Sequence, residues 1–134
     1  MAQPEFRAKL FLEAKISPSE DPSKVIQAMK NLVGEVQYDA AVGPGSAGLE
    51  TDDPRALIRI RDQLRDRHVR SAARKQMIVN RSESRTSLMF NRQAASAGVV
   101  ALCGSPEESP LGPICVTIES EKVDAVADWL TAYS

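Results

Sequence analysis

The chain has 134 residues, the length of one ordinary domain, and this is enough to bury a hydrophobic core without metals or disulfides. Hydrophobic residues make up 43% of it and charged residues 26%, which excludes a chain that is disordered throughout. No apolar run reaches the roughly 18 residues that span a bilayer, and the N-terminus lacks the pattern of a signal peptide. We therefore expect a single cytoplasmic domain over residues 1–134, with no membrane contact.

The net charge of −1 conceals an uneven distribution of charge along the sequence. Residues 55–92 contain eleven basic residues, ten of them arginines, against three acidic ones, so that this block carries a net +8. The remainder carries six basic and fifteen acidic residues, a net −9. The sequence therefore describes an acidic body with one basic block, a distribution that steers polyanions toward one surface.

In chain order, the first predicted elements are a strand, a helix and a hairpin. Residues 5–16 alternate between apolar and charged side chains, which predicts a strand with one covered face. Asp21-Pro22 is typical of a helix start, and Gly34 ends the apolar stripe that follows. Alternation over residues 36–42, a Gly-Pro-Gly turn and a short apolar segment at 47–51 predict an antiparallel hairpin.

The next segment repeats the helix-start signal at Asp53-Pro54, and its apolar register shifts after His68, which predicts a bend or a break into two helical pieces. Residues 86–90 alternate as a strand, and the short polar stretch 91–97 suits one helical turn. The composition of residues 99–103 predicts a strand that is buried on both faces.

A loop with three prolines follows at 104–113 and leads to a last strand at 114–118, after which Ser120 can cap a final helix. The resulting order is β-α-β-β-α-β-β-β-α. Short connections favour antiparallel pairing, so we predict an α+β two-layer sandwich. Its mostly antiparallel sheet has six strands, with three main helices on one face.

The strongest functional signal is a set of arginines on the helical segment after Pro54. At 100° per residue, five of them fall within about 120° of one another. A guanidinium group is planar, permanently charged and able to bind phosphate through paired hydrogen bonds, so this face favours RNA. The alternative is a solvated face on which Asp62 and Asp66 pair with nearby arginines, although three acidic residues cannot neutralise eleven basic ones. The five are Arg55, Arg59, Arg67, Arg70 and Arg74.

A second candidate contact is Asn91-Arg92-Gln93, directly after a predicted strand. Amide and guanidinium groups suit phosphates and base edges, but Asn91 is equally suited to cap a short helical turn. Aromatic residues are few and fall mainly at core positions, so a platform for stacking single-stranded bases is not indicated. This pattern favours recognition of structured RNA by its shape and phosphates.

The sequence contains no recognisable catalytic motif or metal-binding motif. His68 is the only histidine, and Cys103 and Cys115 lack the spacing of a zinc site. We expect both cysteines to be buried, reduced thiols, with a disulfide between them as the alternative. Gly43-Pro44-Gly45 lacks the Lys-Ser/Thr ending of a phosphate-binding loop. We therefore expect neither an enzyme nor a bound metal or cofactor.

Four short stretches of the sequence stand out together: Ala73-Arg74, Phe90-Asn91-Arg92-Gln93-Ala94-Ala95, Glu108-Ser109-Pro110-Leu111-Gly112-Pro113-Ile114 and Asp128-Trp129-Leu130. In this order and spacing they resemble the archaeal UPF0201 family of small proteins predicted to bind RNA. Its fold is similar to that of the ribosomal protein that contacts 5S RNA, so the resemblance implies the two-layer fold and RNA binding, but no activity. The family usually has Lys at the position of Arg92 and an acidic residue at that of Ser71, which leaves a local ion pair with Arg74 open.

These observations give one main hypothesis and one alternative. The main hypothesis is a non-catalytic protein that binds structured RNA, such as ribosomal RNA. The alternative is a protein-interaction module, or a homodimer, whose basic face meets an acidic protein surface. The predicted RNA contacts are Arg55, Arg59, Arg67, Arg70, Arg74, Asn91, Arg92 and Gln93.

Overall fold

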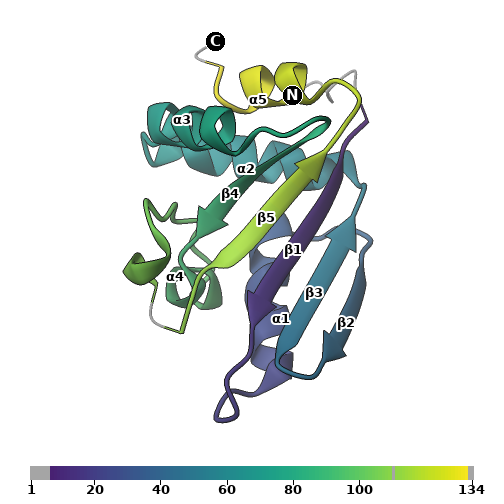
Figure 1. The fold of residues 1–134 in the computed structure, drawn as a ribbon, viewed down its shortest axis with the longest axis vertical. Coiled ribbons are helices and arrows are strands. Elements are labelled where there is room, and N and C mark those ends of the chain that lie inside the picture. Colours follow the sequence, from purple (N-terminus) through teal and green to yellow (C-terminus); the bar gives the residue numbers. More distant parts are fainter. Residues whose placement is uncertain (1–6, 110, 133–134) are drawn as a thin grey trace.

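Five antiparallel strands form one sheet in the computed structural model, which describes residues 7–109 and 111–132 (Figure 1). The strand order is β2-β3-β1-β5-β4, and all four neighbouring pairs are antiparallel. The first strand is therefore central, whereas β2 and β4 are the edges of the sheet. The strands are β1 (Lys9–Lys15), β2 (Asp39–Gly43), β3 (Ser46–Thr51), β4 (Arg85–Phe90) and β5 (Ile114–Glu119).

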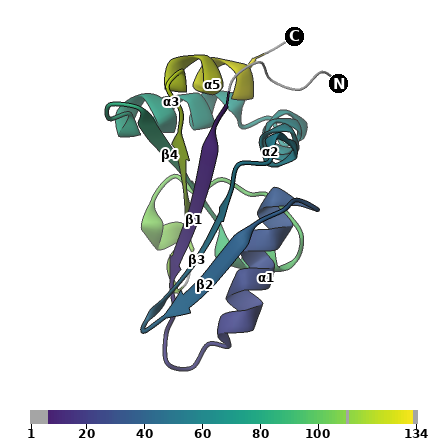
Figure 2. The ribbon, with the colours of Figure 1, turned by 90° about the vertical axis from the view of Figure 1, so that its right-hand side faces the viewer.

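Helices cover one face of this sheet (Figures 1 and 2). The first two lie behind the sheet in Figure 1, with α1 over β3, while α3 packs against β4. The last helix, α5, contacts α2 and α3, and the short α4 contacts α1. The helices are α1 (Pro22–Val33), α2 (Pro54–Asp66), α3 (Arg70–Asn80), α4 (Arg92–Ser96) and α5 (Val123–Leu130). Within the described residues, none is long and apolar enough to span a membrane.

The alternating pattern of β1 decides which face of the sheet is covered. Leu10, Leu12 and Ala14 are buried beneath the helices, whereas the charged residues of the strand, Lys9, Glu13 and Lys15, are exposed. The neighbouring strands β3, β4 and β5 bury every second residue in the same way, and their apolar residues complete the core. One face of the sheet is therefore open, as the alternation predicted.

The predicted helix boundaries are largely confirmed. Asp21 and Asp53 each accept a hydrogen bond from a backbone N–H two residues on, with a proline in the first turn. Gly34 ends α1 with φ of 82°, a conformation that is strained for a residue with a Cβ atom. His68 has φ of 58° between α2 and α3, so the predicted break is present.

The predicted sixth strand is wrong, because residues 99–103 meet β4 only at its end. The contact is a single bridge between Leu102 and Phe90, flanked by hydrogen bonds from Asn91 N–H to Ala101 O and from Cys103 N–H to Met89 O. The start of this segment is bound to α4 instead, since Val99 N–H donates to Ala94 O within that helix.

The first two predicted strands were also too long. The predicted strand 5–16 begins at Lys9, and residues 5 and 6 lie outside the described residues. The predicted strand 36–42 forms only from Asp39, because the backbone of Gln37 bonds to the side chains of Thr51 and Asp53 instead of a neighbouring strand.

Truncation of a core leucine on α2 tests the position of the helical layer. Leu64 is fully buried, so Leu64→Ala is expected to lower the free energy of unfolding by about 2–5 kcal/mol in a urea titration. Leu111→Ala is the matched control, because Leu111 is 57% exposed and its loss should change stability by less than about 0.5 kcal/mol. Equal effects of the two changes would contradict the described packing.

Candidate nucleic-acid interface

The predicted arginine face is divided between two helices, and several of its guanidinium groups are bound within the protein. On α2, Arg59 donates from Nε to Asn31 O at 2.8 Å. On the other side of the helix, Arg61 donates from Nε to Trp129 O at 2.9 Å and lies 5.0 Å from the Trp129 ring centre. Both carbonyls belong to the last turn of a helix, where backbone acceptors lack partners and positive charge is favourable. The two arginines thus join α2 to α1 and α5.

Three arginines that follow α2 fix the C-terminal helix. Arg70 donates to Ala132 O at 3.0 Å, beyond the end of α5. Arg74 pairs with Asp128 at 2.7 Å, and Arg81 pairs with Asp124 one turn earlier on α5. The Arg74–Asp128 pair joins two of the stretches that carry the family resemblance. It also shows that Arg74 has an acidic partner although Ser71 is uncharged, because that partner comes from α5.

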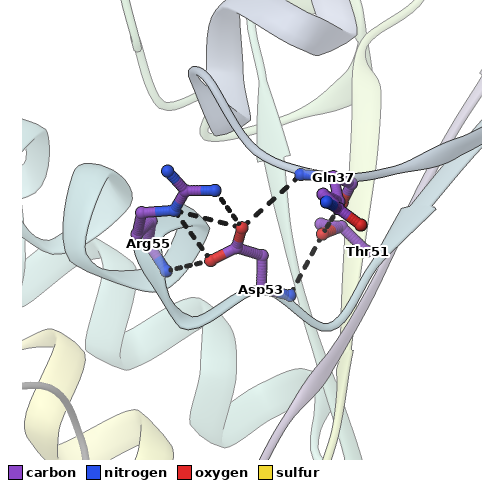
Figure 3. Close-up of polar contacts among 4 residues, drawn as sticks. All are labelled: Gln37, Thr51, Asp53 and Arg55. Atoms are coloured by element: carbon purple, nitrogen blue, oxygen red, sulfur yellow. Dashed lines mark hydrogen bonds and ion pairs between the residues drawn. The ribbon is translucent and has the colours of Figure 1, made fainter.

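Arg55 forms a polar network with the residue that caps α2 (Figure 3). Its Nη2 lies 2.7 Å from Asp53 Oδ2, and its backbone N–H donates to Asp53 Oδ1 at 3.0 Å. Asp53 N–H donates to Thr51 Oγ1, whose hydroxyl donates to Gln37 O at 2.6 Å. The hydrogen bonds from the Arg55 side chain lower the pKa of Asp53 to about 2, so this carboxylate is ionised at neutral pH.

The structure places Arg92 in the interior, which corrects its prediction as an RNA contact. Only 4% of the residue is exposed, and its Nη1 donates to both carboxylate oxygens of Glu20 at 2.9 and 2.8 Å. Partial burial raises the pKa of Glu20, but hydrogen bonds from Ser17 and Arg92 outweigh it and lower the pKa. A guanidinium buried in this way is not accessible to a phosphate.

The neighbours of Arg92 also have structural roles. Asn91 caps α4, because its Oδ1 accepts a hydrogen bond from Ala94 N–H at 2.9 Å. This confirms the capping role that was the alternative to an RNA contact for Asn91. Ser109 Oγ accepts from Arg92 N–H at 3.1 Å and donates to Gly112 O at 3.0 Å, so the two remaining resemblance stretches meet here. Gln93 is exposed. No periodicity in the sequence predicted these contacts; the one hint was that the stretches occur together.

The helical surface remains positive after these contacts are counted. Nine basic residues between Arg55 and Arg81 face five carboxylates, three from the α2 region and two from α5. The excess is therefore +4. The sequence alone gives +7 over residues 55–81, nine basic residues against Asp62 and Asp66. Arg67 and Lys75 are exposed, and the Arg65 contacts to Asp62 and Asp66 are long at 3.5 Å. These cations, rather than the whole predicted set, are available to a ligand.

The described residues give no support for a metal site or for a reactive cysteine. They contain no group of three or more His, Cys, Asp or Glu side chains that could hold a metal ion. Cys103 is buried and Cys115, contrary to prediction, is exposed, and both are free thiols. Desolvation of the sulfur atom by surrounding protein raises the pKa of each thiol, even though the Cys115 residue reaches the surface, and this disfavours the nucleophilic thiolate. A hollow of about 1040 Å³ beside the start of α2 is lined by four basic and four acidic side chains, without a net charge of either sign.

The fold and this surface define a class of protein: a small α+β domain with one open sheet face and one positively charged helical layer. No family model matches the chain. A UPF0201 protein of Sulfurisphaera tokodaii is 34% identical over 125 residues, 92% of this chain and 86% of the relative. A second, from Sulfolobus acidocaldarius, is 33% identical with the same coverage.

The chain belongs to the UPF0201 family, as the sequence resemblance implied. The crystal structure of a UPF0201 protein from Methanococcus jannaschii has a TM-score of 0.76 at 21% identity, with 94% of each chain covered. A protein from Archaeoglobus fulgidus described as DUF54 has a TM-score of 0.73 at 16% identity, covering 95% of this chain and 99% of that one. These likenesses extend the fold across archaeal proteins of low sequence identity.

The buried ion pair should be essential for stability. Arg92→Met leaves the Glu20 carboxylate without its partner, so we expect the free energy of unfolding to fall by about 3–5 kcal/mol in a urea titration. The double change Glu20→Met with Arg92→Met should be less damaging than Arg92→Met alone, because no unpaired charge is left. Gln93→Ala is the exposed neighbouring control; an Arg92→Met protein as stable as this control would disprove the buried pair.

The Asp53 network predicts a loss of stability in acid. A carboxyl whose pKa falls from 3.8 to about 2 on folding stabilises the protein above about pH 4, and this contribution is lost as the pH falls through 2. Urea titrations between pH 5 and pH 2 should show this loss in the native protein. Asp53→Asn keeps an oxygen that can cap α2 but removes the titration, so its stability should vary less over this range. Identical pH profiles would contradict the assignment.

Proposed function

We propose that this protein is a non-catalytic, cytoplasmic RNA-binding protein that holds structured RNA, ribosomal RNA included, at the exposed cations of α2 and α3. The observation that carries the proposal is the excess of four positive charges on this helical surface, in a chain whose net charge is −1. Such a surface attracts a polyanion and orients it toward one side of the molecule.

The ion pairs on this surface do not block the approach of phosphates. In the Arg74–Asp128 pair the side chains are 51% and 64% exposed, and exposed pairs contribute only about 0.2–1 kcal/mol. A phosphate can therefore replace the aspartate at little cost, whereas Arg59 is held by a helix end and Arg92 by burial. The proposed contacts are accordingly Arg55, Arg65, Arg67, Arg74 and Lys75.

The aromatic side chains outside the core support structured rather than single-stranded RNA. Tyr38 is 37% exposed, but Lys30 lies 5.4 Å from its ring centre, and Lys9 lies 5.3 Å from that of Phe11 on the open sheet face. Neither ring belongs to α2 or α3, the two helices that carry the proposed cations. Phosphates in a fixed geometry, as in a hairpin or duplex, suit the surface better than stacked bases.

Charge reversal and salt dependence test the proposal together. The double change Arg67→Glu with Lys75→Glu should weaken binding to a hairpin RNA at least about tenfold and reduce the slope of log affinity against log salt. Lys24→Glu on α1 is the control, because this exposed lysine lies in the first turn of α1, whereas Arg59 of α2 binds the last turn. Affinity that is constant between about 50 and 300 mM salt, or lost equally in the control, would reject RNA binding at this surface.

One observation favours a second candidate function, the binding of an acidic protein partner. Ile78 and Val79 on α3 are 64% and 74% exposed, beside a cleft of about 250 Å³ whose lining includes Met77, Val123 and Ala127. An apolar patch with a charged rim is typical of protein interfaces and offers little to phosphates. The double change Ile78→Ser with Val79→Ser should leave RNA affinity unchanged if RNA is the ligand, and should abolish partner binding if a protein is.

A further inference from the structure

The two edge strands of the sheet differ in how far other parts of the protein cover their outer side, and β4 is the covered strand. Its backbone is bonded along most of its length by groups outside the sheet. Arg85 exchanges two hydrogen bonds with Ser82, while Ser87 O accepts from the Asn80 side chain. At the far end, Met89 N–H donates to Gln76 Oε1 and Met89 O accepts from Cys103 N–H. A further strand cannot pair with β4 without displacing these contacts.

The other edge strand, β2, has no comparable cover. In the described part of the chain, no hydrogen bond from outside the sheet reaches residues 39–43. All five residues of β2 are exposed, and Val42 is 55% exposed. Natural edge strands are protected by lysines, prolines, bulges or covering segments, and β2 has an unbroken register with β3 and one charge, at Asp39. Figure 2 shows β2 in front, with its outer side open.

The register of the β2–β3 hairpin shows which backbone groups point outward. Gly43 and Ser46 face each other across the two-residue loop, and hydrogen-bonded pairs alternate with non-bonded pairs along an antiparallel ladder. Ala40 and Val42 therefore direct their N–H and C=O groups away from β3. These two residues form the free pairing edge.

We propose that β2 is a dimerisation edge that pairs antiparallel with β2 of a second copy, about a two-fold axis at Ala41. In this register, Ala40 faces Val42 of the second copy and exchanges hydrogen bonds with it. Asp39 faces Gly43, so the single charge of each strand opposes an uncharged residue and no like charges meet. The small side chains allow close approach, and the two sheets become one continuous sheet.

This inference is independent of RNA binding, because β2 carries none of the proposed RNA contacts. Strand pairing over five residues buries less area than a permanent dimer needs, so self-association should be reversible and depend on concentration. Sedimentation velocity of the full chain, from about 1 to 200 µM, should show a shift from one chain to two. A single-chain mass over the whole range would overturn the proposal, and would leave an extended peptide from another protein as the strand that β2 accepts.

Two matched lysine substitutions test which surface is used. Val42→Lys places a charge on the pairing edge and should weaken self-association at least about tenfold. Leu111→Lys makes the same change at a residue of nearly equal exposure, 57% against 55%, and should leave self-association unchanged. Unfolding curves that match the native protein establish that both variants fold. Equal effects on self-association would overturn the assignment to β2.

Cysteine crosslinking tests the register. In a Cys115→Ser background, Ala41→Cys places two thiols opposite each other at the two-fold axis, and oxidised glutathione should convert the protein into a covalent dimer. Ala40→Cys should crosslink poorly, because its counterpart faces Val42. Efficient crosslinking at residue 40 but not at residue 41 would overturn the proposed axis.

Discussion

The helical layer depends on one chemical property, the five N–H donors that each guanidinium group carries in a fixed plane. A helix end leaves carbonyl oxygens without partners, and an arginine from a neighbouring helix can bind them from the side. Arg59 does this for α1 and Arg61 for α5, while Arg70 binds the backbone beyond α5. Without these contacts, α5 would rest on the layer through its apolar residues and two exposed ion pairs.

This arrangement changes the meaning of the basic block in the sequence. Counted along the chain, the block carries +8, but charge counted along a sequence ignores acidic residues that approach from elsewhere. Asp124 and Asp128 lie more than forty positions from their partners, Arg81 and Arg74. Two positive charges of the block are balanced by these aspartates, which attach the C-terminal helix. What remains is a smaller positive surface formed by exposed residues, of which Arg65 and Lys75 were not among the predicted contacts.

Local signals predicted the elements well and long-range contacts poorly. The alternation of β1, the Asp-Pro helix starts and the break at His68 all follow from short-range sterics and hydrogen bonding, and the structure contains them. The prediction of a strand at 99–103 is wrong because hydrophobicity indicates that a segment is buried, but not that it pairs with a neighbouring strand. The prediction for Arg92 is wrong for a similar reason, because a charged residue after a strand suits a binding site and a buried ion pair equally. Only its partner Glu20, 72 positions away, decides between them.

The contrast between the two edges of the sheet has a consequence for assembly. A protein with two bare edges can add copies without end and form fibrils, since each new copy presents another free strand. In the described part of the chain, Gln76, Asn80 and the segment around Cys103 close the edge at β4 and leave the edge at β2 free to accept a strand. Growth therefore stops after a single addition, and the side chains on α3 that seal the far edge also set the upper limit on the size of any sheet built from this protein.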